Sequence, residues 1–342
     1  MACLTIAEAL REALREEMAR DETIFCIGED IGIPGGWGGA FTVTLGLERD
    51  FRDRIIDTPI SENGFFGVAL GAALMGLRPV VDVQYGDFLF CAMDQIVNQI
   101  AKMRYMSGGK LKVPLVMRAP VGSTGRGAQH GQNPEAIFLN VPGLKIVCPA
   151  TAYDAKGLLK AAIREDNPVL IFEHKLLYGA KGARAESGSV NASSEIPEED
   201  YVVPIGKGVV RRQGEDVTIV ATLLMMHRAL AAAEILQHQG ISAEVIDPRS
   251  LVPFDWELVS SSVKKTTRLI VVTEGPRTGS VASEIAATAG ERLMDYLTAP
   301  VLRVTSPDIP APFSPAMEGF YRPDAERICG AVRSVLGMKA SA

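Results

Sequence analysis

The sequence lacks the features that mark several large classes of protein. Its five cysteines include no C-x-x-C pair, so a zinc site is not expected. No apolar run reaches the roughly 18 residues that a membrane-spanning helix needs. Basic residues never form a run longer than two, and the net charge is −6, which argues against nucleic acid as a main partner. These absences predict a globular protein with neither a membrane nor a nucleic-acid partner.

The familiar signatures of nucleotide binding and hydrolysis are missing as well. "GGWGG" (35–39) is glycine-rich, but it is neither a dinucleotide-binding fingerprint nor a phosphate-binding loop of the Walker type. No G-x-S-x-G, H-E-x-x-H or kinase signature occurs. The first 22 residues mix acids and bases, which is not typical of a signal or transit peptide. The scattered cysteines, most with apolar neighbours, favour small buried thiols in a reducing cytoplasm.

Segments with strand and helix patterns alternate along the chain. Thr5 and Glu8 have capping-box spacing and begin a helix whose apolar residues recur every four positions. Further helices are expected at 63–76, 91–106 and 152–166. Strands are expected at 23–28, 54–57, 78–84, 113–120, 143–150 and 167–174. This alternation predicts an α/β fold with a mostly parallel sheet.

A polar, small-residue stretch at 179–201 separates this run from a second one. In the second run, strands are expected at 216–224, 241–251, 268–275 and 299–306, and helices at 227–240, 280–297 and 322–337. We therefore predict two α/β domains, each a mostly parallel sheet flanked by helices. Their predicted bounds are 1–190 and 205–342, with a linker at 191–204.

Glu62 is a single acid at a predicted strand-to-helix turn, among small and apolar residues. One interpretation is structural: Ser61 caps the helix and Glu62 interacts with its dipole. The other is functional: a carboxyl buried near Phe65, Phe66 and Phe88 can exchange a proton near neutral pH.

A second candidate is the glycine-rich loop "GSTGRGAQHGQNPE" (122–135), which follows a strand and carries Arg126 and His130. By itself the loop is weak evidence for an anion or cofactor site. The other three histidines lie where a structural or exposed role is the simpler interpretation.

Six segments occur in an order that resembles one family. They are "GED" (28–30), "DTPISENGFFGVALGAALMGLRPV" (57–80), "DQIVNQIAKMRYMSGG" (94–109), "AQHGQNPEAIF" (128–138), "PGLKIVCPATAYDAKGLL" (142–159) and "NPVLIFEHKLLYG" (167–179). The chain resembles the β subunit of the thiamine-diphosphate-dependent decarboxylase component of 2-oxo acid dehydrogenase complexes. "AEVIDPRSLVPFD" (243–255) and "VASEI" (281–285) extend the resemblance over nearly the whole chain.

The resemblance implies a transketolase-like pyrimidine-binding domain followed by a transketolase C-terminal domain. It also implies an assembly of two α and two β chains, in which the α subunit holds the diphosphate through Mg²⁺ with a GDG motif. This sequence contains no GDG, as expected of a β subunit. A dihydrolipoyl acyltransferase core is the further partner that the family implies, and its contact is expected on 205–342.

The resemblance assigns roles residue by residue. Glu62 matches the catalytic glutamate. In the family this glutamate forms a hydrogen bond with a nitrogen of the cofactor's pyrimidine ring and favours the imino tautomer of that ring. Phe88 matches the ring that packs on the pyrimidine, and Glu29 and Gln84 match other positions beside the cofactor. His130 matches a histidine that orients substrate and helps pass the acyl group to lipoamide.

A structural monovalent cation such as K⁺ is also implied. The matching positions are Leu115, Ala162, Ile163, Glu165 and Asn167. Asp166 departs from one common form of this segment, and an ordinary helix end is the alternative interpretation.

The reaction implied is decarboxylation of a small 2-oxo acid, or cleavage of acetoin, with transfer of the acyl group to lipoamide. "GGWGG" and "EHKLLYG" are similar to the acetoin-cleaving relatives, whereas "HGQNPEAIF" and "FYRPD" (320–324) are closer to the branched-chain type, and pyruvate stays open. Two rival hypotheses are a self-sufficient thiamine enzyme of transketolase type and a non-catalytic scaffold subunit. The missing diphosphate motif opposes the first of these.

Overall fold

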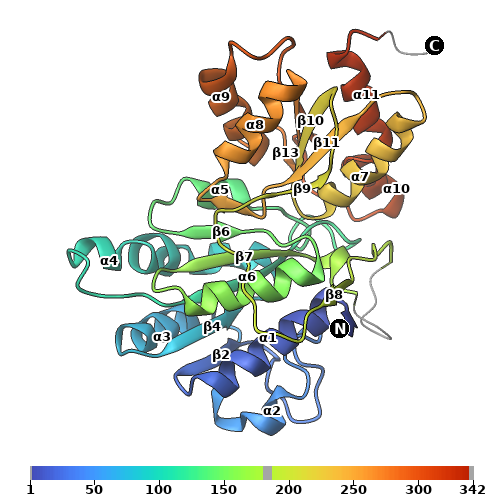
Figure 1. The fold of residues 1–342 in the computed structure, drawn as a ribbon. Helices are drawn as coiled ribbons and strands as arrows, with labels where there is room; N and C mark the ends of the chain where they lie inside the picture. The colour runs from blue at the N-terminus through green and yellow to red at the C-terminus, as the bar shows by residue number, and fades with distance from the viewer. Residues whose placement is uncertain (1, 180–186, 339–342) are drawn as a thin grey trace.

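The chain folds around two large sheets, each covered by helices on both faces, with a third, two-stranded sheet beside them (Figure 1). The computed structural model describes residues 2–179 and 187–338. Most of the polar stretch predicted at 179–201 is described, but residues 180–186 lie outside the described part. The predicted fold class, two mostly parallel α/β domains, is confirmed. The exact domain and linker bounds stay predictions.

The first sheet has seven strands. From one edge to the other they are β12 (Ser250–Val252), β6 (Lys145–Val147), β7 (Val169–His174), β5 (Val116–Val121), β4 (Arg78–Asp82), β2 (Ile24–Gly28) and β3 (Ile55–Asp57). All neighbours are parallel except β12, which runs antiparallel to β6. The carboxyl ends of the parallel strands therefore meet along one edge, where parallel α/β sheets place their binding groups.

Strand β12 comes from the second half of the sequence, although it joins the first sheet. A single strand is expected at 241–251, but the structure divides it into β11 (Ala243–Asp247) and β12. Pro248 has no N–H for a ladder bond, and Arg249 has a positive φ of 57°, so the strand cannot continue. The turn sends the chain from one sheet to the other and ties the two domains together.

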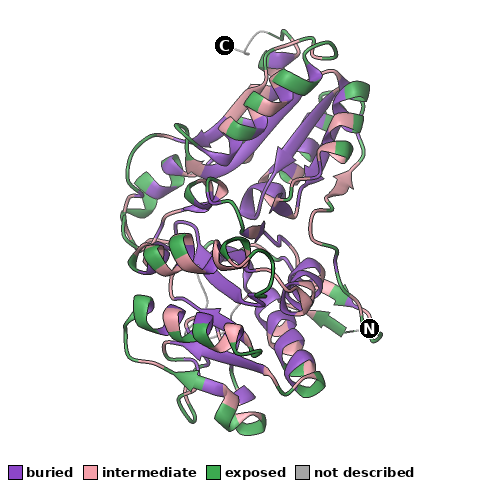
Figure 2. Cartoon of the chain, turned by 90° about the vertical axis from the view of Figure 1, so that its left-hand side faces the viewer, coloured by how far each residue is buried: buried purple, intermediate pink, exposed green. Residues whose placement is uncertain are grey.

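Alternating residues of the strands face two separate cores. In β2, Ile24 and Cys26 pack under α1 (Ile6–Arg20) and α6 (Ala152–Arg164). Phe25 and Ile27 face the opposite side, where α3 (Glu62–Leu74) covers the sheet. Because both faces are covered, β2, β5 and β7 are buried along their whole length, whereas the edge strand β3 has two exposed residues; Figure 2 shows the mostly buried strands.

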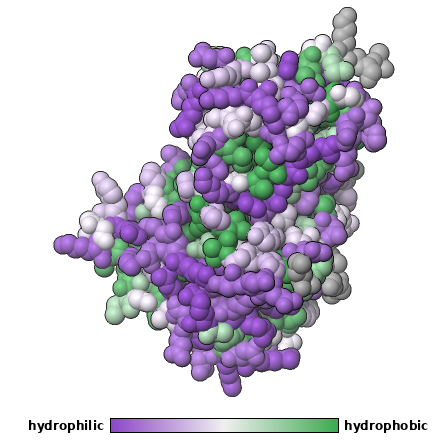
Figure 3. Space-filling view, in the orientation of Figure 1, coloured by the Kyte–Doolittle hydropathy of each residue, from purple (hydrophilic) through white to green (hydrophobic). Residues whose placement is uncertain are grey.

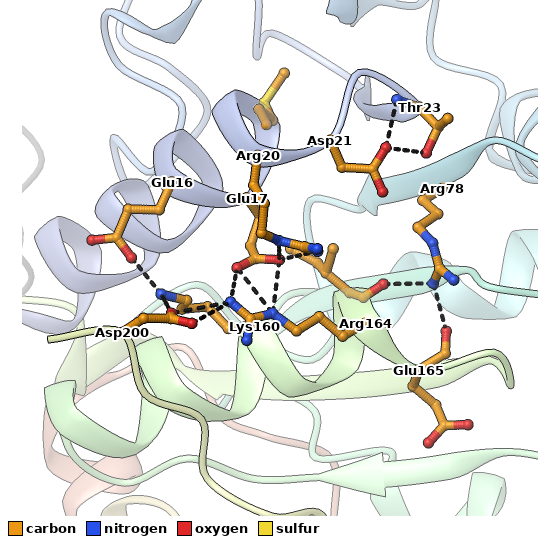
Figure 4. Close-up of polar contacts among 12 residues, drawn as sticks. Glu16, Glu17, Arg20, Asp21, Thr23, Arg78, Lys160, Arg164, Glu165 and Asp200 are labelled. Carbon is orange, nitrogen blue, oxygen red and sulfur yellow. Dashed lines mark hydrogen bonds and ion pairs between the residues drawn. The ribbon is translucent and has the colours of Figure 1, made fainter.

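Helix α1 begins as its sequence predicts. Thr5 Oγ1 accepts the Glu8 N–H at 3.3 Å, and Glu8 Oε2 accepts the Thr5 N–H at 2.9 Å. Along its outer side, α1 pairs with α6 through charges (Figure 4). Arg164 Nη2 lies 2.6 Å from Glu17 Oε1, and Lys160 Nζ lies 2.5 Å from Glu16 Oε2. Glu17 and Lys160 are buried, so these pairs fix how the two helices pack.

The second sheet has five strands. Their order is β14 (Leu302–Ser306), β13 (Leu269–Pro276), β10 (Val217–Ala221), β11 and β9 (Val209–Arg212). Only β9 is antiparallel to its neighbour. Its helices lie on two faces, α7 (Leu224–Gln237) with α11 (Ala325–Val335) on one and α8 (Trp256–Thr266) with α9 (Val281–Leu293) on the other. The small sheet of β1 (Ala2–Leu4) and β8 (Ser194–Ile196) completes the fold.

One expected helix is not continuous. Instead of a helix over 91–106, the chain forms the 3₁₀ turns η2 (Gly86–Ala92), the π-helical segment η3 (Asp94–Ile100) and the short helix α4 (Met103–Met106). Ile96 and Ile100 are buried against the same core as α3. The apolar residues of this segment do face the core as the pattern predicts. Sequence periodicity, however, does not distinguish an α-helix from a π-helical segment.

Candidate active site

Glu62 is the first residue of α3 and lies just beyond the carboxyl end of β3. Glu62 is 8% exposed, and Phe65 and Phe66 follow it on the same helix with their rings tilted to each other and their centroids 5.4 Å apart. Ser61 precedes the helix, but its hydroxyl makes no capping bond; the Ser61 carbonyl instead accepts the Phe65 N–H at 3.0 Å. The side-chain cap proposed in the structural interpretation of this turn is therefore absent.

Glu29 lies next to Glu62, because it directly follows the neighbouring strand β2. Its Oε1 atom is buried and has no hydrogen-bond partner. Burial, and then the charge of Glu62, raise the pKa of Glu29 to about 7. The same two acids help to raise the pKa of the Cys91 thiol, after burial. Two carboxyls thus share one partly buried place, and one of them carries a proton below about pH 7.

Gly28 makes this arrangement of strands fit. A Cβ at this position would lie 2.3 Å from the carbonyl oxygen of Asp82 on β4. Only glycine allows the two parallel strands to approach so closely at the end that leads to Glu29.

Gln84 follows β4, but both ends of its amide are already bonded within the chain. Its Oε1 accepts the Ala40 N–H at 2.6 Å, and its Nε2 donates to Asp82 Oδ1 at 3.0 Å. Asp82 is in turn paired with the buried Arg118 at 2.5 Å. The structure places Gln84 at the expected edge of the sheet, where it ties down the 38–40 loop.

Phe88 and His130 come together from distant parts of the sequence. Their rings meet edge to face with centroids 5.4 Å apart, and Tyr85 approaches His130 in the same way at 5.8 Å. Phe88 belongs to η2, which packs on α3, so this aromatic pair lies on the segment next to Glu62. Both rings are partly exposed, which leaves a face available to another molecule.

The residues expected to bind a monovalent cation lie around the end of α6. The carbonyl of Ile163 accepts a bond from Arg78 Nη1 at 2.9 Å, and the Glu165 carboxylate pairs with Lys145 at 2.6 Å. The same Arg78 Nη1 donates to the Glu165 carbonyl at 3.0 Å (Figure 4). Asn167 donates to Glu165 Oε1 at 2.6 Å. Arg78 and Lys145 thus already supply positive charge to these acceptors. The other two positions use their carbonyls within the chain, Leu115 to Val169 N at 2.9 Å and Ala162 to Glu165 N at 3.2 Å.

As placed, these residues do not form a free cage of oxygens, and the cation stays a prediction. Within residues 2–179 and 187–338, no group of three or more histidine, cysteine or acidic side chains is arranged to hold a metal ion.

A cavity of about 690 Å³ lies between the two domains, where Figure 3 shows apolar surface. Its walls combine Leu223, Met225 and Val281 with the polar Asn133 and Glu135. Burial raises the pKa of Glu135 to about 8. None of Glu29, Glu62 and Phe88 lines this cavity, so a site centred on Glu62 is separate from it.

Sequence reasoning did not identify several residues that shape the site. Lys175 is buried, donates to the main-chain oxygen of His130, and lies 4.6 Å from the Tyr85 ring centre. Arg118 bridges Asp82 and Glu173 through buried ion pairs. The segments "EHKLLYG" and "VPLVMRAP" contain these residues, but an isolated sequence gives no sign that a lysine or arginine will be buried.

Across the described residues, no helix is both long and apolar enough to cross a membrane.

Comparisons with known proteins identify the domains and the family of the chain. Residues 3–181 match the transketolase pyrimidine-binding domain, and residues 206–328 match the transketolase C-terminal domain.

Curated relatives match along almost the whole chain. The 2-oxoisovalerate dehydrogenase subunit beta of Bacillus subtilis is 44% identical over 98% of this chain and 99% of its own length. The acetoin:2,6-dichlorophenolindophenol oxidoreductase subunit beta of the same organism is 42% identical over 98% of both chains. The pyruvate dehydrogenase E1 component subunit beta of Rhizobium meliloti is 44% identical over 98% of this chain and 70% of its own length.

Among solved structures, a chain described as a split-gene transketolase in an inactive β4 tetramer superposes with a TM-score of 0.78. It is 26% identical, and the match covers 99% of this chain and 100% of that one. Sequence, domain content and fold therefore agree, and the chain belongs to the transketolase-like family of β subunits of 2-oxo acid and acetoin dehydrogenase components.

Proposed function

We propose that the chain supplies the pyrimidine-binding half of a thiamine diphosphate site, and that an α subunit completes it. The assembled enzyme decarboxylates a small 2-oxo acid, or cleaves acetoin, and passes the acyl group to lipoamide. The observation that carries this proposal is the neighbouring pair Glu29 and Glu62, with Phe88 on the segment that packs against α3, in a chain from this family. The similar structure described as an inactive β4 tetramer supports a need for a second kind of subunit.

In this proposal, Glu62 exchanges a proton with a pyrimidine ring nitrogen. Glu62 is suited to this role because its carboxyl is largely withdrawn from water at the start of α3. Thiamine diphosphate, when bound, supplies the electron sink for decarboxylation. Glu29, whose pKa burial raises to about 7, adds little negative charge beside Glu62 below that pH. Its buried, unpartnered Oε1 marks a place where a ligand atom can bond.

The remaining site residues receive supporting roles. Phe88 offers the partly exposed ring that packs on the pyrimidine, and His130 beside it orients substrate and assists acyl transfer. Gln84 acts by holding the 38–40 loop through Ala40. Since this sequence has no GDG motif, Mg²⁺ is held mainly by the α subunit.

The proposed assembly contains two α and two β chains and docks on a dihydrolipoyl acyltransferase core through residues 205–342. All five cysteines are free, which supports a reducing compartment such as the cytoplasm. To bind at the end of α6, K⁺ must displace the bond from Arg78 to the Ile163 carbonyl and the ion pair of Lys145 with Glu165.

One assay separates this proposal from its two rivals. The chain is purified alone and together with its α subunit, and reduction of a dye is followed with pyruvate, branched-chain 2-oxo acids and acetoin. Activity that requires both chains supports the proposal, and the preferred substrate names the class. Activity of the chain alone would indicate a self-sufficient enzyme. No activity with any substrate in a correctly assembled tetramer would indicate a scaffold.

A further inference from the structure

The loop 122–131, which carries His130, is anchored on its own domain at both ends. The Gly122 N–H donates to the Gln132 carbonyl at 3.2 Å and closes the loop. Asp87 Oδ1 accepts the Gln132 N–H at 3.1 Å, and Lys175 donates to the His130 carbonyl. Between these anchors four of the ten residues are glycines, and the contacts within the first domain include Arg126 over the Tyr85 ring at 5.8 Å and the His130 N–H to the Gly127 carbonyl at 3.3 Å.

The second domain contacts the same loop through three charged side chains. Glu274, at the end of β13, accepts both the Ser123 N–H at 2.8 Å and the Ser123 hydroxyl at 3.0 Å. Glu318, on α10 (Pro315–Tyr321), accepts the Gly125 N–H at 2.6 Å. Arg322 follows α10 and donates to the Ser123 carbonyl at 2.7 Å. Side chains of the second domain therefore form hydrogen bonds with both N–H groups and a carbonyl of the loop backbone.

These contacts are built into the interior of the domain boundary. Glu274 and Glu318 are each 5% exposed, and Glu274 Oε2 lies 2.8 Å from His174 Nε2. Burial by itself opposes ionisation, but His174 and the Ser123 N–H hold the pKa of Glu274 at about 2. Hydrogen bonds to such buried charges are stronger than those between neutral groups, and they are costly to break.

Apolar contacts from the second domain support the other half of the loop. A Cβ on Gly127 would lie 3.3 Å from the Phe313 ring, and one on Gly131 would lie 3.1 Å from the Ala311 side chain. The glycines thus allow the loop backbone to rest directly on the 311–313 segment.

We propose that the second domain positions His130: Glu274, Glu318 and Arg322 fix the glycine-rich loop so that the imidazole faces Phe88. A glycine-rich loop loses more conformational entropy on ordering than other segments, so external bonds are needed to hold one of its side chains in place. The second domain then serves the reaction as well as any docking. The role of the imidazole rests on the proposed function, whereas the restraint on the loop does not.

The test compares Arg322→Ala and Glu318→Gln with a matched control, Arg327→Ala. Arg327 lies five residues after Arg322, but it bonds only carbonyls of its own domain, those of Thr305, Phe320 and Tyr321. Each variant is assembled with the α subunit. Hydrogen–deuterium exchange of the 122–131 amides then reports loop opening, and steady-state kinetics report catalysis.

We expect the 122–131 amides to exchange at least about tenfold faster in Arg322→Ala and Glu318→Gln, because the first removes a charge-assisted bond and the second replaces a charged acceptor with a weaker, neutral one. Acyl transfer to a lipoylated acceptor should fall by about 10- to 100-fold. Thiamine diphosphate affinity should stay within about twofold of the wild-type value, and Arg327→Ala should match the wild type in all three measurements. Arg322→Lys keeps a donor near Ser123 and should restore part of the slow exchange.

Two results would overturn the proposal. One is unchanged exchange across 122–131 in both variants, which would show that the loop is held without the second domain. The other is faster exchange with undiminished acyl transfer in an enzyme that His130→Ala does inactivate. If His130→Ala itself has no effect while exchange rises in the variants, the restraint stands and only the assigned role of the imidazole is wrong.

Discussion

At the scale of single residues, the proposed site depends on two neighbouring carboxyls, Glu29 and Glu62. Glu62 begins α3 and Glu29 directly follows β2, so two regular elements position their backbones. Burial, and then the neighbouring Glu62, raise the pKa of Glu29 to about 7. Carboxyls with pKa values raised by burial and by a neighbouring acid are typical of catalytic sites.

Glu62→Gln keeps the side-chain shape but cannot release a proton. We expect the variant to assemble with the α subunit and to bind thiamine diphosphate, while exchange of the thiazolium C2 proton slows by about 10²- to 10⁴-fold. NMR-detected exchange into D₂O measures this rate directly. Glu284→Gln, an exposed acid on α9, is the control. Exchange as fast as in the wild type would reduce Glu62 to a helix-start residue.

His130→Ala removes the imidazole that faces Phe88. Acyl transfer to a lipoylated acceptor should fall by about 10²- to 10⁴-fold, whereas cofactor affinity should change little, since the ring lies beside Phe88 on the exposed side. The matched control is His238→Ala, on an exposed helix end. Equal losses in cofactor binding and acyl transfer would argue that His130 is structural.

Glu29 gives a pH dependence with a defined sign. Its pKa is raised from 4.5 to about 7, so between these values the folded chain binds more protons than the unfolded chain. Its contribution to stability is therefore most favourable below about pH 4.5 and becomes progressively less favourable as the pH rises to about 7. Glu29→Gln should remove this part of the slope in Tm, measured between about pH 5 and about pH 8. The exposed Glu22→Gln should keep the wild-type slope.

At the scale of elements, the sheet edge depends on the close approach of β2 and β4. Gly28→Ala would place a methyl 2.3 Å from the Asp82 carbonyl, so either strand must shift. We expect a loss of about 1–3 kcal/mol in the free energy of unfolding, measured by denaturant titration. Gly290→Ala is the control, because α9 leaves nothing within 4 Å of that Cβ and helix propensity favours alanine. If both variants are equally stable, Gly28 is not constrained by β4.

Elements with local signals were predictable from sequence, and those set by distant contacts were not. The spacing of Thr5 and Glu8 predicts the start of α1, and both hydrogen bonds of the capping box are present in the structure. By contrast, Ser61 looks like a cap in sequence but makes no such bond. The antiparallel pairing of β12 with β6 depends on packing between the two domains. No local pattern encodes that pairing.

The site residues likewise divide into those that sequence motifs predict and those that only distant contacts bring together. Glu62, Glu29, Phe88 and His130 could be proposed from motifs of the family, and the structure brings them to adjoining elements. The contacts that Arg322 and Glu318 make with the His130 loop join residues nearly 200 positions apart. Such pairings appear only when the two domains are seen together.

At the scale of the whole molecule, we infer that the chain presents half of a site. Glu29 and Glu62 lie beyond the carboxyl ends of β2 and β3 at one edge of the first sheet, and neither these acids nor the Phe88–His130 pair line the cavity between the domains. A carboxyl needs exclusion from water to exchange a proton efficiently near neutral pH, so a second subunit must cover this edge. The sequence contains no GDG motif with which to hold a diphosphate by itself.

The most direct measurement is therefore calorimetric titration of thiamine diphosphate with Mg²⁺ into the chain alone, into its α subunit alone and into the assembled tetramer, with turnover recorded in parallel. We predict that only the tetramer binds tightly, at least about 100-fold more tightly than the chain alone (about 2.7 kcal/mol), and that only the tetramer turns over a 2-oxo acid or acetoin. Tight binding and turnover by the chain alone would contradict the account.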